Sequence, residues 1–214
     1  MCPGGGPAGR LDFLIMAPTT EPTTDSATTE FDWLDLQKRA HREFGARVAA
    51  VTDWHAPTPD TDWDVSDLVR HVVEEQQWVP HLLAGRTIPQ AQLSMDKLRD
   101  DLAEEWSLYS FAATSAWSAT PAEAPVQLSY DTVEAHEYLR EQVADVTIHA
   151  WDLARAVGAD EQLDDELVRA VWTVFEPQKD ALEASGLFAS PVPVPEDAPL
   201  QSRLLAITGR DDRR

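Results

Sequence analysis

The pattern of apolar and polar positions predicts one long helix, from Asp131 to Gly158, which organises the rest of the chain. Its apolar residues recur at intervals of three and four and form one stripe: Leu139, Val143, Val146, Ala150, Leu153 and Val157. Asp131 or Thr132 can cap the first turn, and Gly158 is the residue type that commonly ends a helix in a left-handed conformation. We therefore expect this helix to bury one face in a core.

The same periodicity predicts four more helices. They span Asp32–Val51, Val65–Ala84, Ser94–Ala119 and a segment from Asp164 to about Ser185. Pro80 and Pro177 fall inside two of these segments and are expected to kink them. The proline-rich tail from Gly186 is expected to be extended and to end in a short helical turn at Leu200–Ile207. No alternating pattern predicts a strand, so the fold class is all-α, a helix bundle with an additional C-terminal helix and an extended tail.

Charge and composition exclude several classes of function. The chain of 214 residues has a formal net charge of −21, which argues against nucleic-acid binding and against binding to anionic membranes. Its single cysteine, Cys2, excludes a disulfide framework and a cysteine-based zinc site. No apolar run reaches the ~20 residues of a membrane span. We expect a cytoplasmic protein.

The N-terminal segment differs from the rest of the chain in composition. Residues 1–30 are rich in Gly, Pro and Thr and cannot bury enough apolar surface to offset the entropy lost on ordering. We expect a disordered or mobile leader here, followed by a single helical domain over residues 31–210. Met16 is a second candidate start of translation.

Candidate chemistry lies beside the stripe of the long helix. Asp145 and His149 are four residues apart, so a carboxylate oxygen and an imidazole nitrogen can reach one divalent cation from the same helix face. An ordinary ion pair on the helix surface explains the same spacing, and a metal site needs a third ligand. His71 interrupts the apolar stripe of the second helix. On the residues alone its simpler interpretation is a core histidine bonded to a backbone carbonyl.

Three stretches of the chain together carry a family likeness: Asp67–Trp78, Asp145–Gly158 and Val194–Arg210. They resemble an actinobacterial family of DinB-like metal-binding proteins, which is related to the metal-binding domain of mycothiol-dependent maleylpyruvate isomerase. The resemblance extends over residues 31–210. It implies a DinB-like four-helix bundle that holds a divalent metal, zinc or nickel, through three side chains.

The resemblance also implies which residues form the site. The three ligands correspond to His71, Asp145 and His149, and Asp145 stands where the isomerase has a longer Glu. Asp152 is expected to hydrogen-bond near the site without binding the metal. Glu75 is a candidate fourth ligand or catalytic base, or only a polar neighbour. The tryptophans Trp78, Trp106, Trp117 and Trp151 are expected to pack the core or line the pocket mouth, and the remaining histidines are expected on the surface: His41, His55, His81 and His136.

Two functions from different classes follow from this resemblance. In the first, the metal binds a small thiol, mycothiol by resemblance, lowers its pKa and presents the thiolate to a small electrophile, as in a thiol S-transferase or related enzyme. Isomerisation of maleylpyruvate itself is not expected, because the isomerase completes its site with an additional C-terminal domain and this chain has only a tail there. The alternative is a non-catalytic metal-containing bundle, a stress-associated binding protein or scaffold. A metal-free small-molecule binder follows if Asp145 is too short to bind a metal, and a homodimer through helix faces is an option the sequence leaves open.

Overall fold

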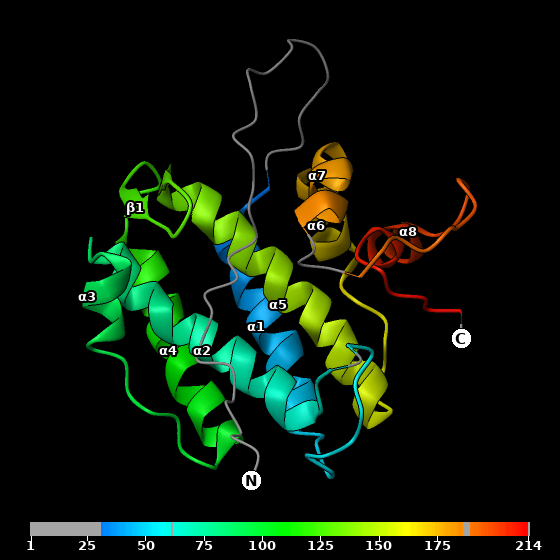
Figure 1. The fold of residues 1–214 in the computed structure, drawn as a ribbon, viewed down its shortest axis with the longest axis horizontal. Coiled ribbons are helices and arrows are strands. Elements are labelled where there is room, and N and C mark those ends of the chain that lie inside the picture. Colours follow the sequence, from blue (N-terminus) through cyan, green and yellow to red (C-terminus); the bar gives the residue numbers. More distant parts are fainter. Residues whose placement is uncertain (1–30, 61, 186–188, 214) are drawn as a thin grey trace, which may run out of the picture.

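The structure, a computed structural model, describes residues 31–60, 62–185 and 189–213 (Figure 1). The leader predicted for residues 1–30 lies outside these residues. Most of the described chain is helical, which confirms the all-α, DinB-like bundle. The elements are α1 (Trp33–Val48), α2 (Val65–Leu83), α3 (Ile88–Gln92), α4 (Leu102–Ala119), β1 (Pro125–Gln127), β2 (Thr132–Glu134), α5 (Ala135–Val157), α6 (Asp165–Phe175), η1 (Glu176–Gln178), α7 (Lys179–Ser185) and α8 (Leu200–Ile207).

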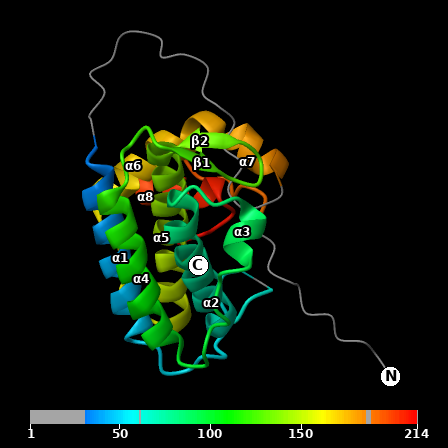
Figure 2. The ribbon, with the colours of Figure 1, turned by 90° about the vertical axis from the view of Figure 1, so that its left-hand side faces the viewer.

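Four long helices build the bundle. α1 packs against α5 and α4, and α2 packs against the same two helices from the other side, so that α5 lies beside both α1 and α2 (Figure 2). α6 packs on α5, and α8 packs on α6. Among the described residues, no helix is long and apolar enough to cross a membrane.

Aspartate side chains cap the N-termini of four α-helices in the described chain. Asp32, Asp64, Asp101 and Asp164 each accept a hydrogen bond from a backbone N–H in the first turn of α1, α2, α4 and α6. They satisfy donors that have no partner within the helix. The first two and the last agree with the sequence-based boundaries. α2 continues through Pro80 to Leu83, and Pro177 falls in the 3₁₀ turn η1, which separates α6 from α7.

The start of α5 differs from the prediction. The helix begins at Ala135, because Thr132–Glu134 pairs with Pro125–Gln127 as an antiparallel hairpin. The absence of strands was therefore a wrong prediction. Val126 and Leu128 are buried, so the hairpin closes one end of the core (Figure 2). The hairpin segment also caps the helix, because the Ala135 N–H donates to the Ala124 carbonyl at 2.8 Å.

The predicted helix over residues 94–119 was wrong in its first turns. α4 starts at Leu102, after the cap Asp101, and the short α3 precedes it with Thr87 as its cap. Leu98 is buried at 7% exposure although it lies outside any helix. Leu98 packs into the core from an irregular segment, and its spacing from the apolar residues of α4 matched that of a helix.

The core contains the predicted stripe of α5. Five of its six residues are buried, and Val157 is half-buried. Trp78, Trp106, Trp117 and Trp151 are also buried, as expected for residues that pack the core. Gly45 lies where α1 meets Trp106, and a Cβ atom there would lie 2.9 Å from the indole Nε1. Close helix packing therefore explains a glycine inside α1.

Candidate metal centre

His71, Asp145 and His149 lie together between two packed helices. α2 carries His71, and α5 carries the other two residues one turn apart. The Asp145 Oδ1 atom is 3.4 Å from His149 Nε2 and 3.9 Å from His71 Nε2. One potential ligand atom from each residue lies within 4.8 Å of the others. The fold therefore brings all three predicted residues into one cluster, hereafter the triad.

The triad fits a divalent cation in its donor chemistry. Two imidazole nitrogens and a carboxylate oxygen are a common donor set for zinc and other transition metals. The second carboxylate oxygen, Asp145 Oδ2, is buried and has no hydrogen-bond partner among the described residues. A buried carboxylate oxygen without a donor is costly, and a bound cation would satisfy it.

The carboxylates at the triad favour a positive charge on the groups between them. Burial alone would raise the pKa of the Asp145 carboxyl, but the facing imidazoles of His149 and His71 outweigh it and keep that pKa far below its ordinary value. Burial lowers the pKa of His149, whereas Asp145 and Asp152 raise it, with a net result of about 9. Without a metal, the site therefore stabilises an imidazolium, and a metal would replace its proton on Nε2.

Asp152 orients one of the triad imidazoles. Its Oδ2 atom lies 3.1 Å from His149 Nδ1, and the carboxylate is completely buried. A hydrogen bond from Nδ1 to a carboxylate leaves Nε2 facing Asp145 and His71. Asp152 thus lies in the outer position expected for it. Its carboxylate also accepts two hydrogen bonds from Arg210, a residue for which the sequence predicted no role.

Trp63 is a second residue near the triad that sequence reasoning did not assign to the site. It lies in the loop before α2, and its ring centroid is 4.8 Å from that of His71 and 5.8 Å from that of His149. Thr58 holds this loop, because its hydroxyl donates to the Trp63 carbonyl at 2.9 Å. An aromatic residue just before a helix is an ordinary packing feature, so its type and position gave no signal of a role at the triad.

Glu75 is buried one turn beyond His71 on α2. It accepts a hydrogen bond from Gln142 Nε2 at 3.4 Å. Burial raises its pKa to about 7, against an opposing attraction to His71. The cluster of close ligand atoms in the described chain consists of the triad and does not include Glu75.

His41 is not the surface residue that was predicted. Its ring lies within hydrogen-bond distance of Gln37 on α1, Gln76 on α2 and Thr114 on α4, in a cluster of polar groups that we call the amide network. Burial lowers the pKa of His41 to about 4. The prediction failed because two of its three partners, Gln76 and Thr114, lie on other helices. His55 is exposed, as expected, and His81 and His136 are partly exposed.

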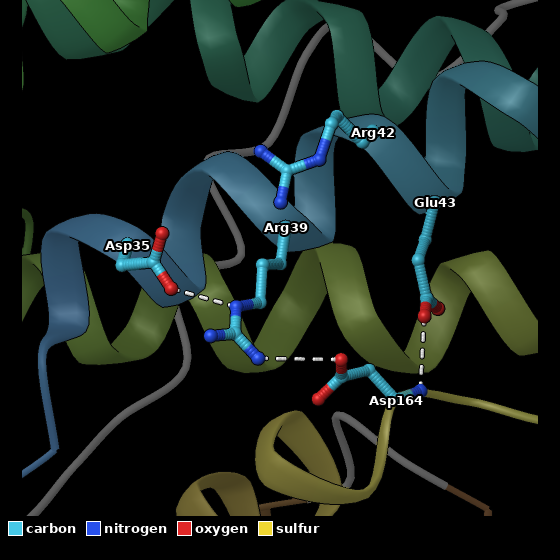
Figure 3. A pocket seen from close by; sticks show the side chains of 5 residues that line it. All are labelled: Asp35, Arg39, Arg42, Glu43 and Asp164. Carbon is cyan, nitrogen blue, oxygen red and sulfur yellow. Dashed lines mark hydrogen bonds and ion pairs between the residues drawn. The ribbon is translucent and has the colours of Figure 1, made fainter.

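A pocket of about 400 Å³ lies elsewhere, between α1 and the start of α6 (Figure 3). Its lining is Asp35, Arg39, Arg42, Glu43 and Asp164. Arg39 binds Asp35 at 2.6 Å and Asp164 at 3.4 Å, and Glu43 accepts the Asp164 backbone N–H at 2.9 Å. These contacts tie α6 to α1, so the pocket is explained by packing of the two helices.

Comparison with known proteins gives one family and two relatives. The model of the mycothiol maleylpyruvate isomerase N-terminal domain matches residues 38–154, which include the triad. Two uncharacterized proteins, from two strains of Mycobacterium tuberculosis, are each 31% identical to the chain over 189 residues. The similarity covers 85% of this chain and 100% of each relative. No solved structure matches significantly. The family resemblance inferred from the sequence is confirmed.

Proposed function

Because the chain belongs to the family of the mycothiol maleylpyruvate isomerase N-terminal domain, we propose that it binds one divalent metal ion, zinc or nickel, and uses it with a small thiol. The metal ligands in this proposal are His71, Asp145 and His149. The observation that carries it is their convergence across two helices, with Asp145 Oδ2 buried and without a hydrogen-bond donor among the described residues.

The proposed reaction is transfer of a low-molecular-weight thiol, of the mycothiol type, to a small electrophile. A bound divalent cation would supply Lewis acidity that lowers the pKa of a thiol. Three protein ligands leave a position for an exogenous group, whereas a closed set of four is typical of a structural site. Glu75, whose pKa is raised to about 7, is the proposed base, because such a carboxyl exchanges a proton near neutral pH.

A non-catalytic metal-containing bundle is the second candidate, and one observation favours it. Trp63 lies close to both imidazoles of the triad, and a large aromatic ring there restricts the space for a thiol and an electrophile. In this case the metal would join α2 to α5, and the indole would keep a thiol and an electrophile away from the open position on the metal.

Metal content tests the part of the proposal that both candidates share. Protein purified without a metal-affinity tag is analysed by elemental mass spectrometry, together with His71→Ala and the matched control His55→Ala. We expect about one zinc or nickel per chain in the wild type and the control, and none in His71→Ala. Absence of metal in the wild type, even after incubation with zinc, would reject the ligand assignment.

Cobalt substitution then separates the two candidates. We load the protein with cobalt(II) and titrate it with a small thiol while recording the absorption spectrum. A new sulfur-to-cobalt charge-transfer band supports thiol chemistry, because it requires a thiolate bound to the metal. An unchanged spectrum at saturating thiol would reject that chemistry and leave the structural candidate.

A further inference from the structure

We propose that Arg210 is a positioning residue of the metal centre, acting on His149 through Asp152. This inference rests on the proposed metal site and adds to it a residue from a different part of the chain. The family match ends at residue 154, and Arg210 follows α8, well outside the matched range. The C-terminal segment would then be part of the metal centre.

The contacts form a continuous chain from the tail to the triad. Arg210 Nε donates to Asp152 Oδ1 at 3.1 Å, and Nη2 donates to Asp152 Oδ2 at 2.7 Å. The same Oδ2 atom is 3.1 Å from His149 Nδ1. A bidentate pairing fixes the plane of the carboxylate, so the oxygen that accepts from His149 has a defined direction.

Both partners of this ion pair are buried. Asp152 has no exposed surface, and Arg210 is 8% exposed. Without the guanidinium, Asp152 would be a buried carboxylate with no cation partner, which is strongly unfavourable, and movement of the side chain toward water would relieve it. Such movement would weaken the hydrogen bond that orients His149. The guanidinium therefore keeps the Asp152 carboxylate in place.

The backbone of the C-terminal tail positions the Arg210 guanidinium. Gly209 ends the α8 turn with a φ of 81°, a conformation that favours glycine. A Cβ atom at this position would lie 2.6 Å from the Ala189 Cβ. Arg210 Nη1 donates to the Thr208 carbonyl at 2.7 Å, which fixes the guanidinium beside its own backbone. Conformation and close packing thus place Arg210 over α5.

Zinc affinity tests the proposal with a matched control. We measure affinity by competition with a chromophoric chelator for wild type, Arg210→Met, Arg210→Lys, Asp152→Asn and the double variant Asp152→Asn/Arg210→Met. Arg203→Met is the control, since Arg203 lies on α8 and packs on Trp172, 4.6 Å from its ring centroid. Thermal unfolding of each metal-free protein, followed by circular dichroism, shows whether the variant is folded.

Loss of a residue that hydrogen-bonds to a metal ligand typically weakens metal binding by about 10- to 100-fold. We expect a loss of zinc affinity in this range for Arg210→Met and for Asp152→Asn. Arg210→Lys should recover part of the loss, and Arg203→Met should bind as wild type does. The double variant should be no weaker than the weaker single variant, because both changes break one link. The visible spectrum of bound cobalt should change in Arg210→Met and remain unchanged in Arg203→Met.

The outcomes separate this proposal from the proposed function. If wild type binds zinc and folded Arg210→Met binds it equally well, the positioning role is rejected and the metal site stands. If wild type binds no zinc, both are rejected. If Arg210→Met does not fold, the double variant decides, because it leaves no unpaired buried charge; wild-type affinity in the folded double variant would reject the role.

Discussion

Two histidines inside the same bundle show how neighbouring groups decide what a buried imidazole does. His41 lies in the amide network, among the uncharged groups of Gln37, Gln76 and Thr114, and burial lowers its pKa to about 4. His149 lies between two carboxylates, and their charge raises its pKa to about 9 in spite of burial. His41 is therefore neutral and packs among uncharged side chains, whereas His149 lies where neighbouring negative charge favours a bound cation.

The two regions also differ in the kind of acceptor that has no partner. Gln76 connects His41 to Gln142, with a bond of 2.9 Å between the two glutamine side chains, so the amide network continues across the bundle. Each region holds one buried oxygen without a hydrogen-bond partner among the described residues: the amide oxygen Gln37 Oε1 in the amide network and the carboxylate oxygen Asp145 Oδ2 at the triad. The carboxylate oxygen is negatively charged, and it is the ligand type of the two that a divalent cation would favour.

Loss of the Asp145 carboxylate should have the largest effect, because it removes the negative charge that distinguishes the triad from the amide network. Asp145→Asn keeps the size of the side chain but loses the charge that attracts a cation. We expect zinc affinity to fall by more than the ~10- to 100-fold typical of an outer partner. Chelator competition measures the loss, with Gln76→Leu in the amide network as control. Equal zinc affinity in Asp145→Asn and wild type would contradict the role of the triad.

The pH dependence of the metal-free protein should show the opposite charge states of the two histidines. The pKa of His149 is raised from 6.5 to about 9, so its contribution to stability is complete below about pH 6.5 and is lost as the pH rises through about 9. The change is on the order of 3 kcal/mol. Urea unfolding at several pH values measures it. Glu75 and Glu141, with pKa values raised to about 7 and about 8, change stability in the same direction.

His149→Gln isolates the histidine in that measurement. The variant should lose the part of the slope between about pH 6.5 and about pH 10 that belongs to the imidazolium. His41→Gln should retain the full slope, because His41 is neutral throughout that range. Identical slopes in all three proteins would show that the two histidines do not differ in charge.

Disruption of the amide network should affect folding and leave metal binding intact. His41→Leu removes a partner of Gln37 and Gln76 and leaves buried amide groups unpaired. We expect a loss of about 1–3 kcal/mol in the free energy of unfolding. Urea unfolding measures this loss, and chelator competition should give wild-type zinc affinity. A large fall in affinity would mean that the two regions are coupled.

The smallest expected effect concerns access to the triad. Trp63→Phe keeps an aromatic ring over the imidazoles but uncovers part of their surface. Zinc content should remain unchanged, while a small chelator should extract the metal faster. Stopped-flow extraction measures the rate, with Trp172→Phe as a control on α6. Equal rates in wild type and Trp63→Phe would show that the indole does not restrict access.

The sequence predicted the helices well where local signals agreed. Asp164 and the apolar spacing that follows it located the start of α6, since cap and stripe pointed to one boundary. The helix predicted from Ser94 began too early, because Leu98, which is buried in the irregular segment before α4, continued the apolar spacing toward the N-terminal side. The hairpin before α5 has strands too short to show an alternating pattern.

Sequence spacing placed Asp145 and His149 on one helix face, and the family resemblance added His71. Arg210 could not be assigned in this way, because its partner Asp152 lies on α5, far away in the chain. An arginine in a proline-rich tail is usually solvated, and only the folded arrangement shows that it is buried. The environment of His41 was hidden for the same reason.

The hydrogen bonds at the start of α5 have a consequence for amide hydrogen exchange. First-turn amides usually exchange quickly with solvent, but the Ala135 and His136 N–H groups donate to the Ala124 and Ala122 carbonyls. At the other end, Gly158 closes the helix, and the Ala159 N–H donates to the Ala154 carbonyl at 2.9 Å. Protection should therefore reach both ends of α5, and fraying should not reach the turn that holds Asp145 and His149 at a constant spacing.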